Sequence, residues 1–385
     1  MVLSKTDPKY RLCQTTVMDN IADPDIRFDE KGICNYYYEY QQAASQLPQG
    51  EKAREELARI VDKIKKDGKG KHYDCLIGLS GGVDSTYVAL LARQFGLRPL
   101  AVHLDNGWDS ELAVKNVENI ITKLGFDLYT LVVNWEEFKD IQLSYLKASV
   151  VDIEVVSDHA IFATMHRLAK QHDTGYIISG TNVVTEYIMP PSWIFQKMDY
   201  ANLKDIHGRY GRVRLKTYPT FDFKKYVYYS AILRLNAISI LNYVPYNKAE
   251  VKEIIKKELD WRDYGGKHYE SVFTKFYQAY ILPEKFHIDK RKAHLSTLIC
   301  SGQLGREEAL KALDGPIYPP SELKTDMEYV RKKFGLTEKE FQEIMDLPIR
   351  KHSDFKTDKK LKQAYMNLLI KTAPIRRKVK DKLFR

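Results

Sequence analysis

Between residues 73 and 200, short apolar runs alternate with longer amphipathic segments. The apolar runs predict strands over residues 73–79, 100–105, 127–133 and 176–179. The amphipathic segments predict helices over residues 83–94, 111–124, 135–148 and 158–171, the last with Ser157 as its N-cap. Strands this apolar suit a parallel sheet that helices cover on both faces. The pattern therefore predicts an α/β fold with a doubly wound parallel sheet.

The flanking segments lack this alternation and divide the chain into three regions. Residues 1–48 are rich in turn formers and predict an irregular N-terminal module. A helix over residues 50–67 leads into the sheet domain, which we assign to residues 49–200. Residues 201–385 are assigned to a largely helical C-terminal region that binds substrate.

The C-terminal region opens with irregular sequence. The basic, aromatic stretch 207–218 is typical of a binding loop, because long irregular insertions in compact enzymes usually serve binding. Helices are expected over residues 225–242 and 249–259. The chain ends in a basic tail, which most simply forms a solvated helix face.

Composition narrows the class of protein. The net charge of +10 over 385 residues favours a polyanionic partner, which RNA, an anionic membrane face or a charged nucleotide could each provide. Four scattered cysteines do not form a secreted disulfide framework, and no signal peptide or run long enough for a transmembrane segment is present. These features predict a cytoplasmic protein.

The chemistry centres on Ser80-Gly81-Gly82-Val83-Asp84-Ser85, which joins the first predicted strand to its helix. Backbone N–H groups at such a helix N-terminus bind anions, and no lysine closes the loop as in GxxxxGK[ST] sequences. Ligands of doubly wound sheets bind beyond the carboxyl ends of the strands. The loops Asp105-Asn106-Gly107 and Gly180-Thr181-Asn182 are therefore expected to converge on the first loop.

The loop resembles the SGGxDS pyrophosphate loop of the PP-loop ATP-pyrophosphatase superfamily, also called adenine nucleotide alpha-hydrolase-like, whose members split ATP into AMP and pyrophosphate. Further marks resemble one branch, the N-acetyl sugar amidotransferases of bacterial surface-polysaccharide and LPS biosynthesis. These marks are Val17-Met18-Asp19, Asp23-Pro24-Asp25-Ile26, Phe28-Asp29-Glu30, Asp105-Asn106-Gly107-Trp108, Ser179-Gly180-Thr181-Asn182 with Glu186, and the block 268–294.

This resemblance implies an ATP-dependent amidotransferase, a carbon–nitrogen ligase that converts a sugar acetamido group to an acetamidino group through an O-adenylyl imidate in O-antigen sugar biosynthesis. The chain begins Met1-Val2-Leu3 and shows no glutaminase domain, so ammonia is expected from separate glutaminase and cyclase-like subunits. A UDP-linked 2,3-diacetamido uronic acid is the first substrate candidate, and a free or CMP-linked nonulosonic acid is the second. No nucleic acid is expected. The alternative is a lysidine-type tRNA-modifying enzyme, which also carries SGGxDS.

The resemblance implies ATP and Mg²⁺ as cofactors and assigns roles to particular residues. Asp84 is expected to hold Mg²⁺. The expected ATP-binding residues are Ser80, Gly81, Gly82, Val83, Asp84, Ser85, His103, Asp105, Gly180 and Asn182. The expected catalytic residues are Asp84, His268, Glu270, Lys285, Lys290 and Arg291, of which His268 and Glu270 titrate usefully for proton transfer. The expected substrate-binding residues are Glu186, Lys275 and Arg291.

The N-terminal module departs from its branch in one respect. Members of the branch often carry C-x2-C twice, a spacing that suits tetrahedral zinc. Here Cys13 and Cys34 are present, but Thr16 and Tyr37 replace the other two ligands. Because two thiolates do not close a structural zinc site, we expect a degenerate, zinc-ribbon-like module without zinc.

Overall fold

The computed structural model describes residues 6–233, 235–265 and 269–383, with side chains through residue 371. Five parallel strands form one sheet in the order β3-β2-β1-β4-β5. The strands are β1 (Cys75–Gly78), β2 (Pro99–Asp105), β3 (Asp127–Val132), β4 (Tyr176–Ser179) and β5 (Asn236–Ser239). The chain passes from β1 to β2 and β3 on one side, then crosses to β4 and β5 on the other. The doubly wound parallel sheet is therefore confirmed, and the strand order reverses between β1 and β4.

Helices cover both faces of this sheet. One buried cluster joins Cys75 and Ile77 of β1 to α2 (Gly50–Asp67), α3 (Val83–Gln94), α4 (Glu111–Leu124) and α10 (Lys248–Leu259). A second cluster on the opposite face joins Leu76 to α6 (Val155–Gln171). Alternate residues of β1 thus point to opposite faces, and both faces are apolar, as a fully buried strand requires.

Two expectations about secondary structure are wrong. Ser157 does not cap α6, because the helix begins at Val155 after Glu154 and Ser157 lies in its first turn. Residues 225–242 are not one helix: they contain part of α9 (Phe223–Val227), a π-helical segment (Tyr228–Leu233), and the edge strand β5. Four residues carry too little periodicity to identify a strand, and the exposed edge of β4 supplies the pairing that fixes it. The sheet therefore extends past residue 200.

The C-terminal region is helical, as expected. Its elements after residue 269 are α11 (Val272–Phe276), a π-helical segment (Tyr277–Ile281), α12 (Leu282–Phe286), α13 (Lys290–Cys300), α14 (Arg306–Asp314), α15 (Pro320–Phe334), α16 (Glu338–Asp346), a 3-10 helix (His352–Asp354) and α17 (Lys359–Leu383). Three further helices, α5 (Trp135–Ala148), α7 (Val183–Glu186) and α8 (Tyr200–Tyr210), lie earlier in the chain. Among the described helices, none combines the length and apolar character that a membrane crossing requires.

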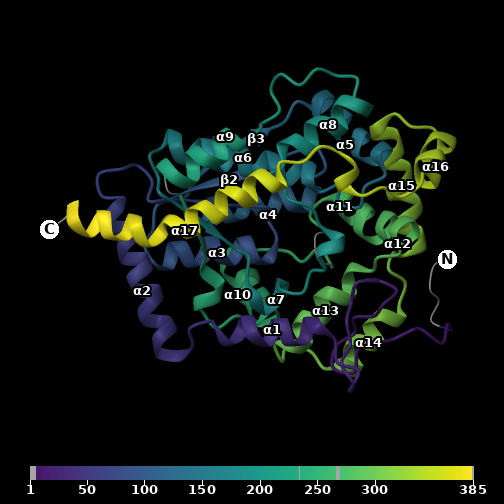
Figure 1. Ribbon diagram of the computed structural model, residues 1–385, viewed down its shortest axis with the longest axis horizontal. Helices are drawn as coiled ribbons and strands as arrows, with labels where there is room; N and C mark the ends of the chain where they lie inside the picture. The colour runs from purple at the N-terminus through teal and green to yellow at the C-terminus, as the bar shows by residue number, and fades with distance from the viewer. Residues whose placement is uncertain (1–5, 234, 266–268, 384–385) are drawn as a thin grey trace.

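The N-terminal segment packs against the C-terminal region. Figure 1 shows this segment and α1 (Asn35–Ser45), in purple, beside α13 and α14. The amide of Val17 donates to Ser296 Oγ of α13 at 3.1 Å, and Arg306 Nη2 donates to the carbonyl of Cys13 at 2.9 Å. Since α13 also carries residues of the candidate site, the contacts between the N-terminal module and α13 help to hold those residues in place.

The two module cysteines are buried next to each other. The amide of Cys34 donates to Cys13 Sγ at 3.2 Å, and Thr16 Oγ1 lies 3.5 Å from Cys34 Sγ. Tyr37 packs against the surrounding apolar cluster. Within the described residues, no cluster of three or more His, Cys, Asp or Glu side chains suits a metal ion. The absence of zinc from the module stays a prediction.

Candidate active site

The loop Ser80 to Ser85 turns from β1 into α3. Gly81 adopts φ of +80°, and its carbonyl accepts hydrogen bonds of 2.7 Å from both Trp261 Nε1 and Tyr264 Oη. The first intrahelical bond runs from the amide of Thr86 to the carbonyl of Gly82 at 3.0 Å. The amides of Val83, Asp84 and Ser85 consequently have no acceptor within the helix, which is the arrangement by which helix N-termini bind anions.

The loop after β4 lies directly against the start of α3. A Cβ added to Gly180 would lie 3.2 Å from both the carbonyl carbon and Cβ of Asp84. Such a contact is tighter than most real Cβ contacts, so any larger residue at position 180 would need the start of α3 to shift slightly. The contact joins the loops of β1 and β4, the strands between which the sheet reverses, and this is where doubly wound sheets bind ligands.

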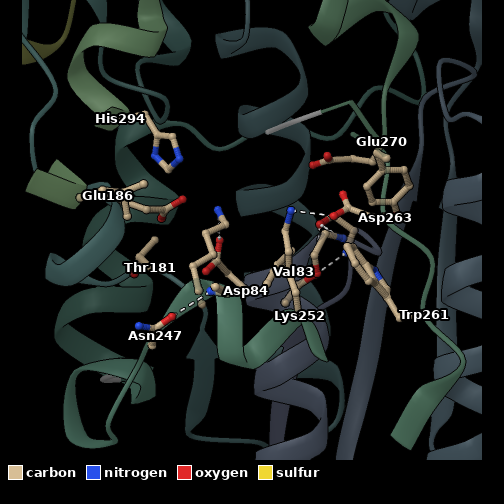
Figure 2. Close-up of a pocket in the computed structure, with 18 of the residues that line it drawn as sticks. Val83, Asp84, Thr181, Glu186, Asn247, Lys252, Trp261, Asp263, Glu270 and His294 are labelled. Carbon is tan, nitrogen blue, oxygen red and sulfur yellow. Dashed lines mark hydrogen bonds and ion pairs between the residues drawn. The ribbon is translucent and has the colours of Figure 1, made fainter. Parts of the chain in front are cut away.

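Two cavities meet at the loop. The larger, of about 630 Å³, is lined by the first turn of α3, by α7 and α10, and by α13, as Figure 2 shows. The smaller, of about 390 Å³, lies over the carboxyl ends of β1 and β2 and beneath α6. Four residues line both cavities: Ser80, Ser85, Ile161 and Glu270. A ligand bound to the loop can therefore extend into either cavity.

Polar and charged side chains surround Asp84 in the larger cavity. The Asp84 carboxylate accepts a hydrogen bond from the Tyr246 hydroxyl, and Lys248 Nζ lies 3.8 Å from Asp84 Oδ2. Burial and the Asp84 charge raise the pKa of Tyr246, so this phenol stays a neutral donor. Glu186 and Thr181 line the same cavity (Figure 2). Carboxylate and hydroxyl oxygens are ligands that suit Mg²⁺, and these three residues could hold it.

Two lysines of α10 face the phosphate loop. Lys248 and Lys252 both line the larger cavity, and Lys252 forms an ion pair of 2.7 Å with Asp263. Lys248 is the first residue of the helix, where the helix dipole disfavours a cation. The negative charge of a ligand in the cavity would offset the unfavourable interaction between the Lys248 ammonium and the helix dipole.

His103 forms a buried ion pair beneath the smaller cavity. Its Nδ1 lies 2.8 Å from the carbonyl oxygen of Leu79, and its Nε2 lies 3.1 Å from Asp109 Oδ2. Burial disfavours the imidazolium, but the hydrogen bond and charge of Asp109 outweigh it and raise the pKa of His103. Both ring nitrogens face acceptors, so the doubly protonated ring satisfies both contacts.

We expect this pair to make stability depend on pH. A raised folded-state pKa means that the stabilisation is complete below the ordinary histidine pKa of 6.5 and is lost as pH rises through the folded-state value. Urea unfolding of wild type and His103→Gln across that range should give a difference of about 1 kcal/mol at acid pH that shrinks toward alkaline pH. A difference independent of pH would contradict the charged pair.

The structure brings many of the expected residues to the cavities. Those lining one or both are Ser80, Gly82, Val83, Asp84, Ser85, His103, Gly180, Glu186, Glu270 and Lys290. Gly81 instead directs its carbonyl toward Trp261 and Tyr264. Asp105 accepts from the amide of Gly107 within its own turn, and Asn182 accepts from the amide of Thr185 as the N-cap of α7. His268 lies outside the described residues.

Three expected cations are placed elsewhere. Lys285 donates to the carbonyls of Ile344, Met345 and Leu347 at 2.7–2.9 Å, where it caps the end of α16. Arg291 pairs with Asp289, and Lys275 pairs with Glu322 and Asp326. None of the three lines either cavity. In this structure each of the three satisfies nearby carbonyls or carboxylates of the C-terminal region, and their catalytic or substrate-binding roles stay predictions.

Replacing Lys285 by methionine should lower the free energy of unfolding by about 2 kcal/mol, because three carbonyls lose a charged donor. Denaturant unfolding measures this loss. The KM for ATP should remain at the wild-type value. A matched Lys290→Met variant alters a residue that lines the smaller cavity and should instead change substrate affinity. A large rise of the KM for ATP in Lys285→Met would contradict the structural assignment.

Sequence reasoning missed several residues of the site. Tyr246, Lys248 and Lys252 follow the phosphate loop by more than 160 positions, and Trp261 and Tyr264 brace the loop from a segment without regular structure. The one local signal was a lysine, Lys248, next to the start of the helix predicted over residues 249–259, where the helix dipole disfavours a cation.

Comparison with known proteins matches two parts of the chain to protein families. The family "NAD synthase" matches residues 55–189, and "LPS biosynthesis protein WbpG-like, C-terminal domain" matches residues 270–369. The first match contains the phosphate loop and shows that this part of the chain is a domain of the NAD synthase or PP-loop ATP-pyrophosphatase type. The second identifies its C-terminal domain as that of the WbpG-like LPS biosynthesis proteins.

Curated relatives match only short parts of the chain. The GMP synthase of Pyrobaculum aerophilum is 36% identical over 75 residues, 19% of this chain and 14% of the relative. The tRNA(Ile)-lysidine synthase of Chlamydia pneumoniae is 38% identical over 71 residues, 17% of this chain and 22% of the relative. The chain thus spans less than a quarter of each relative's length.

Solved structures resemble the chain over a larger part. The NH3-dependent NAD synthetase of Campylobacter jejuni aligns with 74% of this chain and 97% of its own at 13% identity, with a TM-score of 0.31. The NMN synthetase of Francisella tularensis covers 74% of this chain and 97% of its own at 14% identity, with a TM-score of 0.29.

Proposed function

We propose that the protein is an ATP-dependent amidotransferase that converts a sugar acetamido group to an acetamidino group, forming AMP and pyrophosphate. The observation that carries this proposal is the junction of the two cavities at the phosphate loop. Glu270, Ser271 and Lys290, from the WbpG-like domain, line the smaller cavity together with residues of the PP-loop domain. A domain typical of LPS biosynthesis therefore forms part of the wall of the cavity that we propose as the nucleotide site.

The proposed reaction has two steps. The amide oxygen of the sugar attacks the α-phosphorus of ATP, which forms an O-adenylyl imidate and releases pyrophosphate. Ammonia then adds to the imidate carbon, and AMP leaves with the former amide oxygen. The carbon of an amide is a poor electrophile and its oxygen is a poor leaving group, and adenylylation of the oxygen improves both for the attack of ammonia in the second step.

Residues of this chain supply complementary charge. The amides of Val83 to Ser85 and the ammonium of Lys248 line the larger cavity, where they would stabilise the negative charge that develops on the departing pyrophosphate. Asp84 and Glu186 would hold Mg²⁺, and the charge of the bound ion would neutralise phosphate charge. Glu270 lines both cavities and is our candidate for accepting a proton from ammonium.

The proposal also covers the source of ammonia, the compartment and the sugar substrate. We propose that separate glutaminase and cyclase-like subunits deliver ammonia and that the reaction takes place in the cytoplasm, where ATP and nucleotide sugars are available. A UDP-linked 2,3-diacetamido uronic acid is the first candidate substrate, and a free or CMP-linked nonulosonic acid is the second. The net charge of +10 suits either anionic sugar.

The proposal is tested with purified protein, ATP, Mg²⁺, ammonium chloride and each candidate sugar. We expect AMP release with at least one sugar and none without sugar. Ammonium at high concentration should replace the glutaminase partner. If no acetamido sugar supports AMP release while glutamine alone does, the assignment of a separate ammonia source is wrong. ADP release in place of AMP would contradict the PP-loop reaction itself.

The competing function is a tRNA-modifying enzyme of the lysidine type. The match to tRNA(Ile)-lysidine synthase and the exposed cations of the loop after α8, Arg212, Arg214 and Lys216, favour it. Such an enzyme would bind tRNA with a steep dependence on salt concentration. Filter binding at several salt concentrations, together with AMP release stimulated by tRNA and lysine, distinguishes the two functions.

A further inference from the structure

Helix α17 is held to the rest of the protein by one of its sides. Lys362 Nζ donates to the carbonyl of Met198 at 2.6 Å, and the Tyr365 hydroxyl lies 3.1 Å from Ser230 Oγ. The ring of Tyr365 also packs edge-on against the ring of Tyr226 in α9. Figure 1 shows α17, in yellow, running across the molecule toward the C-terminus. The contacts attach the side of α17 that carries Lys362 and Tyr365 to α9 and the π-helical segment that follows it.

A neighbouring side of α17 presents apolar side chains to solvent. Leu361 and Leu368 lie seven positions apart, which places them on the same face of the helix, and they are 52% and 57% exposed. Ala364, between them, is exposed as well. Single exposed apolar residues are ordinary, whereas several on one face with a polar border mark a site of protein or membrane contact. We call Leu361, Ala364 and Leu368, with the lysines described next, the α17 face.

Lysines border these apolar residues. Lys360 and Lys371 are both exposed and lie four positions before and seven positions after Ala364, so they line the same face. Residues 359–371 and the attached residues 223–233 together contain six lysines and no aspartate or glutamate. The sequence after residue 371 adds six lysines and arginines and one aspartate. The charge of this surface therefore complements an anionic partner.

The combination of charge and apolar side chains decides among possible partners. A second copy of the chain on this face would bring the same lysines together, and like charges repel. RNA would pair with the lysines but offers no apolar environment to the leucines. An anionic lipid bilayer accepts both, because lysines pair with the headgroups while leucines enter the boundary between headgroups and acyl chains. Since no described helix is long and apolar enough to cross a membrane, α17 would lie on the bilayer surface.

We propose that the α17 face binds the anionic surface of a lipid bilayer and attaches the protein peripherally to it. This inference goes beyond the proposed function and does not depend on the reaction. It assigns the net charge of +10 in part to a membrane partner, one of the three polyanions that composition alone left open.

Sedimentation of the full-length protein with sucrose-loaded vesicles at low salt tests the proposal. Vesicles of phosphatidylcholine and phosphatidylglycerol in equal amounts should bind the wild-type protein. Vesicles of phosphatidylcholine alone should bind it about tenfold more weakly or less, because they lack net charge. Added sodium chloride should weaken binding to the mixed vesicles, since salt screens the lysines.

Two double variants separate the apolar and the charged contributions. Leu361→Ser with Leu368→Ser should weaken binding to the mixed vesicles about tenfold, because the inserted apolar side chains are lost. Lys360→Gln with Lys371→Gln should weaken it about thirtyfold, equivalent to about 2 kcal/mol. All four side chains are exposed, so thermal unfolding of both variants should match wild type.

Matched controls alter exposed residues of the same kinds on other elements. Val114→Ser with Ile254→Ser changes apolar side chains of α4 and α10, and Lys69→Gln with Lys257→Gln removes two exposed lysines. Both controls should bind the mixed vesicles within about twofold of wild type. Losses as large as those of the α17 variants would show that binding depends on total charge or total apolar surface, and would overturn the assignment to α17.

The remaining outcomes also decide the proposal. Equal binding of wild type to both kinds of vesicle, or to neither, would contradict it. Binding of tRNA by the lysines of α17, with no binding to vesicles, would assign the face to RNA. A dimer in analytical ultracentrifugation that Leu361→Ser with Leu368→Ser dissociates would assign the face to a second copy of the chain.

Discussion

Replacing Asp84 by asparagine is expected to reduce AMP release by about 10³-fold or more, since the variant keeps the shape of the side chain but loses its charge. The carboxylate accepts from the Tyr246 hydroxyl and lies at the first turn of α3, in the cavity that Glu186 also lines. Without it, Mg²⁺ at the phosphates loses an anionic ligand. Chromatography of AMP and pyrophosphate measures the loss, and circular dichroism checks that the fold is retained.

A matched control is Asp173→Asn. Asp173 follows α6 at the opposite end of the sheet, its side chain is 87% exposed, and its φ of +51° suits asparagine as well as aspartate. The control should retain wild-type turnover. Turnover retained in Asp84→Asn as well would mean that the carboxylate of the loop takes no part in the reaction.

Replacing Gly81 by alanine is expected to abolish ATP binding and to destabilise the fold by about 3 kcal/mol. Gly81 has φ of +80°, and a Cβ there would lie 2.9 Å from Tyr264 Oη and 3.2 Å from the carbonyl oxygen of Ala113. Relief of these contacts requires the loop to move away from Tyr264 and Trp261, which hold its carbonyl. Calorimetric titration with ATP and thermal unfolding measure the two effects.

The control variant Gly70→Ala introduces the same backbone strain as Gly81→Ala but no steric clash. Gly70 has φ of +81°, almost the same as Gly81, but a Cβ there would meet nothing within 4 Å. This variant should lose only about 1 kcal/mol and should bind ATP normally. Equal effects of the two substitutions would show that strain alone acts at Gly81 and that the bracing by Tyr264 is unimportant.

The fold was largely predictable because its signals are local. The helix over residues 111–124 was predicted to the residue, since an apolar stripe, an N-cap at Ser110 and a left-handed C-cap at Gly125 define it. The edge strand β5 was missed because its four residues gain their order from β4, which lies 57 or more positions earlier.

The site was only partly predictable because side-chain direction depends on tertiary structure. The phosphate loop carries its own signal, two glycines between a strand and a helix. Nothing local distinguishes Lys285, which caps α16, from Lys290, which lines the smaller cavity, although they are five positions apart. Tyr246 and Lys248 reach Asp84 only through the packing of α10 against α3.

The central claim is that the amide oxygen of a sugar attacks the α-phosphorus of ATP. An acetamido sugar labelled with ¹⁸O in its carbonyl, incubated with the protein, ATP, Mg²⁺ and ammonium, tests it most directly. Mass spectrometry should find the label in the phosphate of AMP and an amidine nitrogen in the sugar. Label retained in the sugar while AMP forms, or transferred to inorganic phosphate with release of ADP, would contradict the claim.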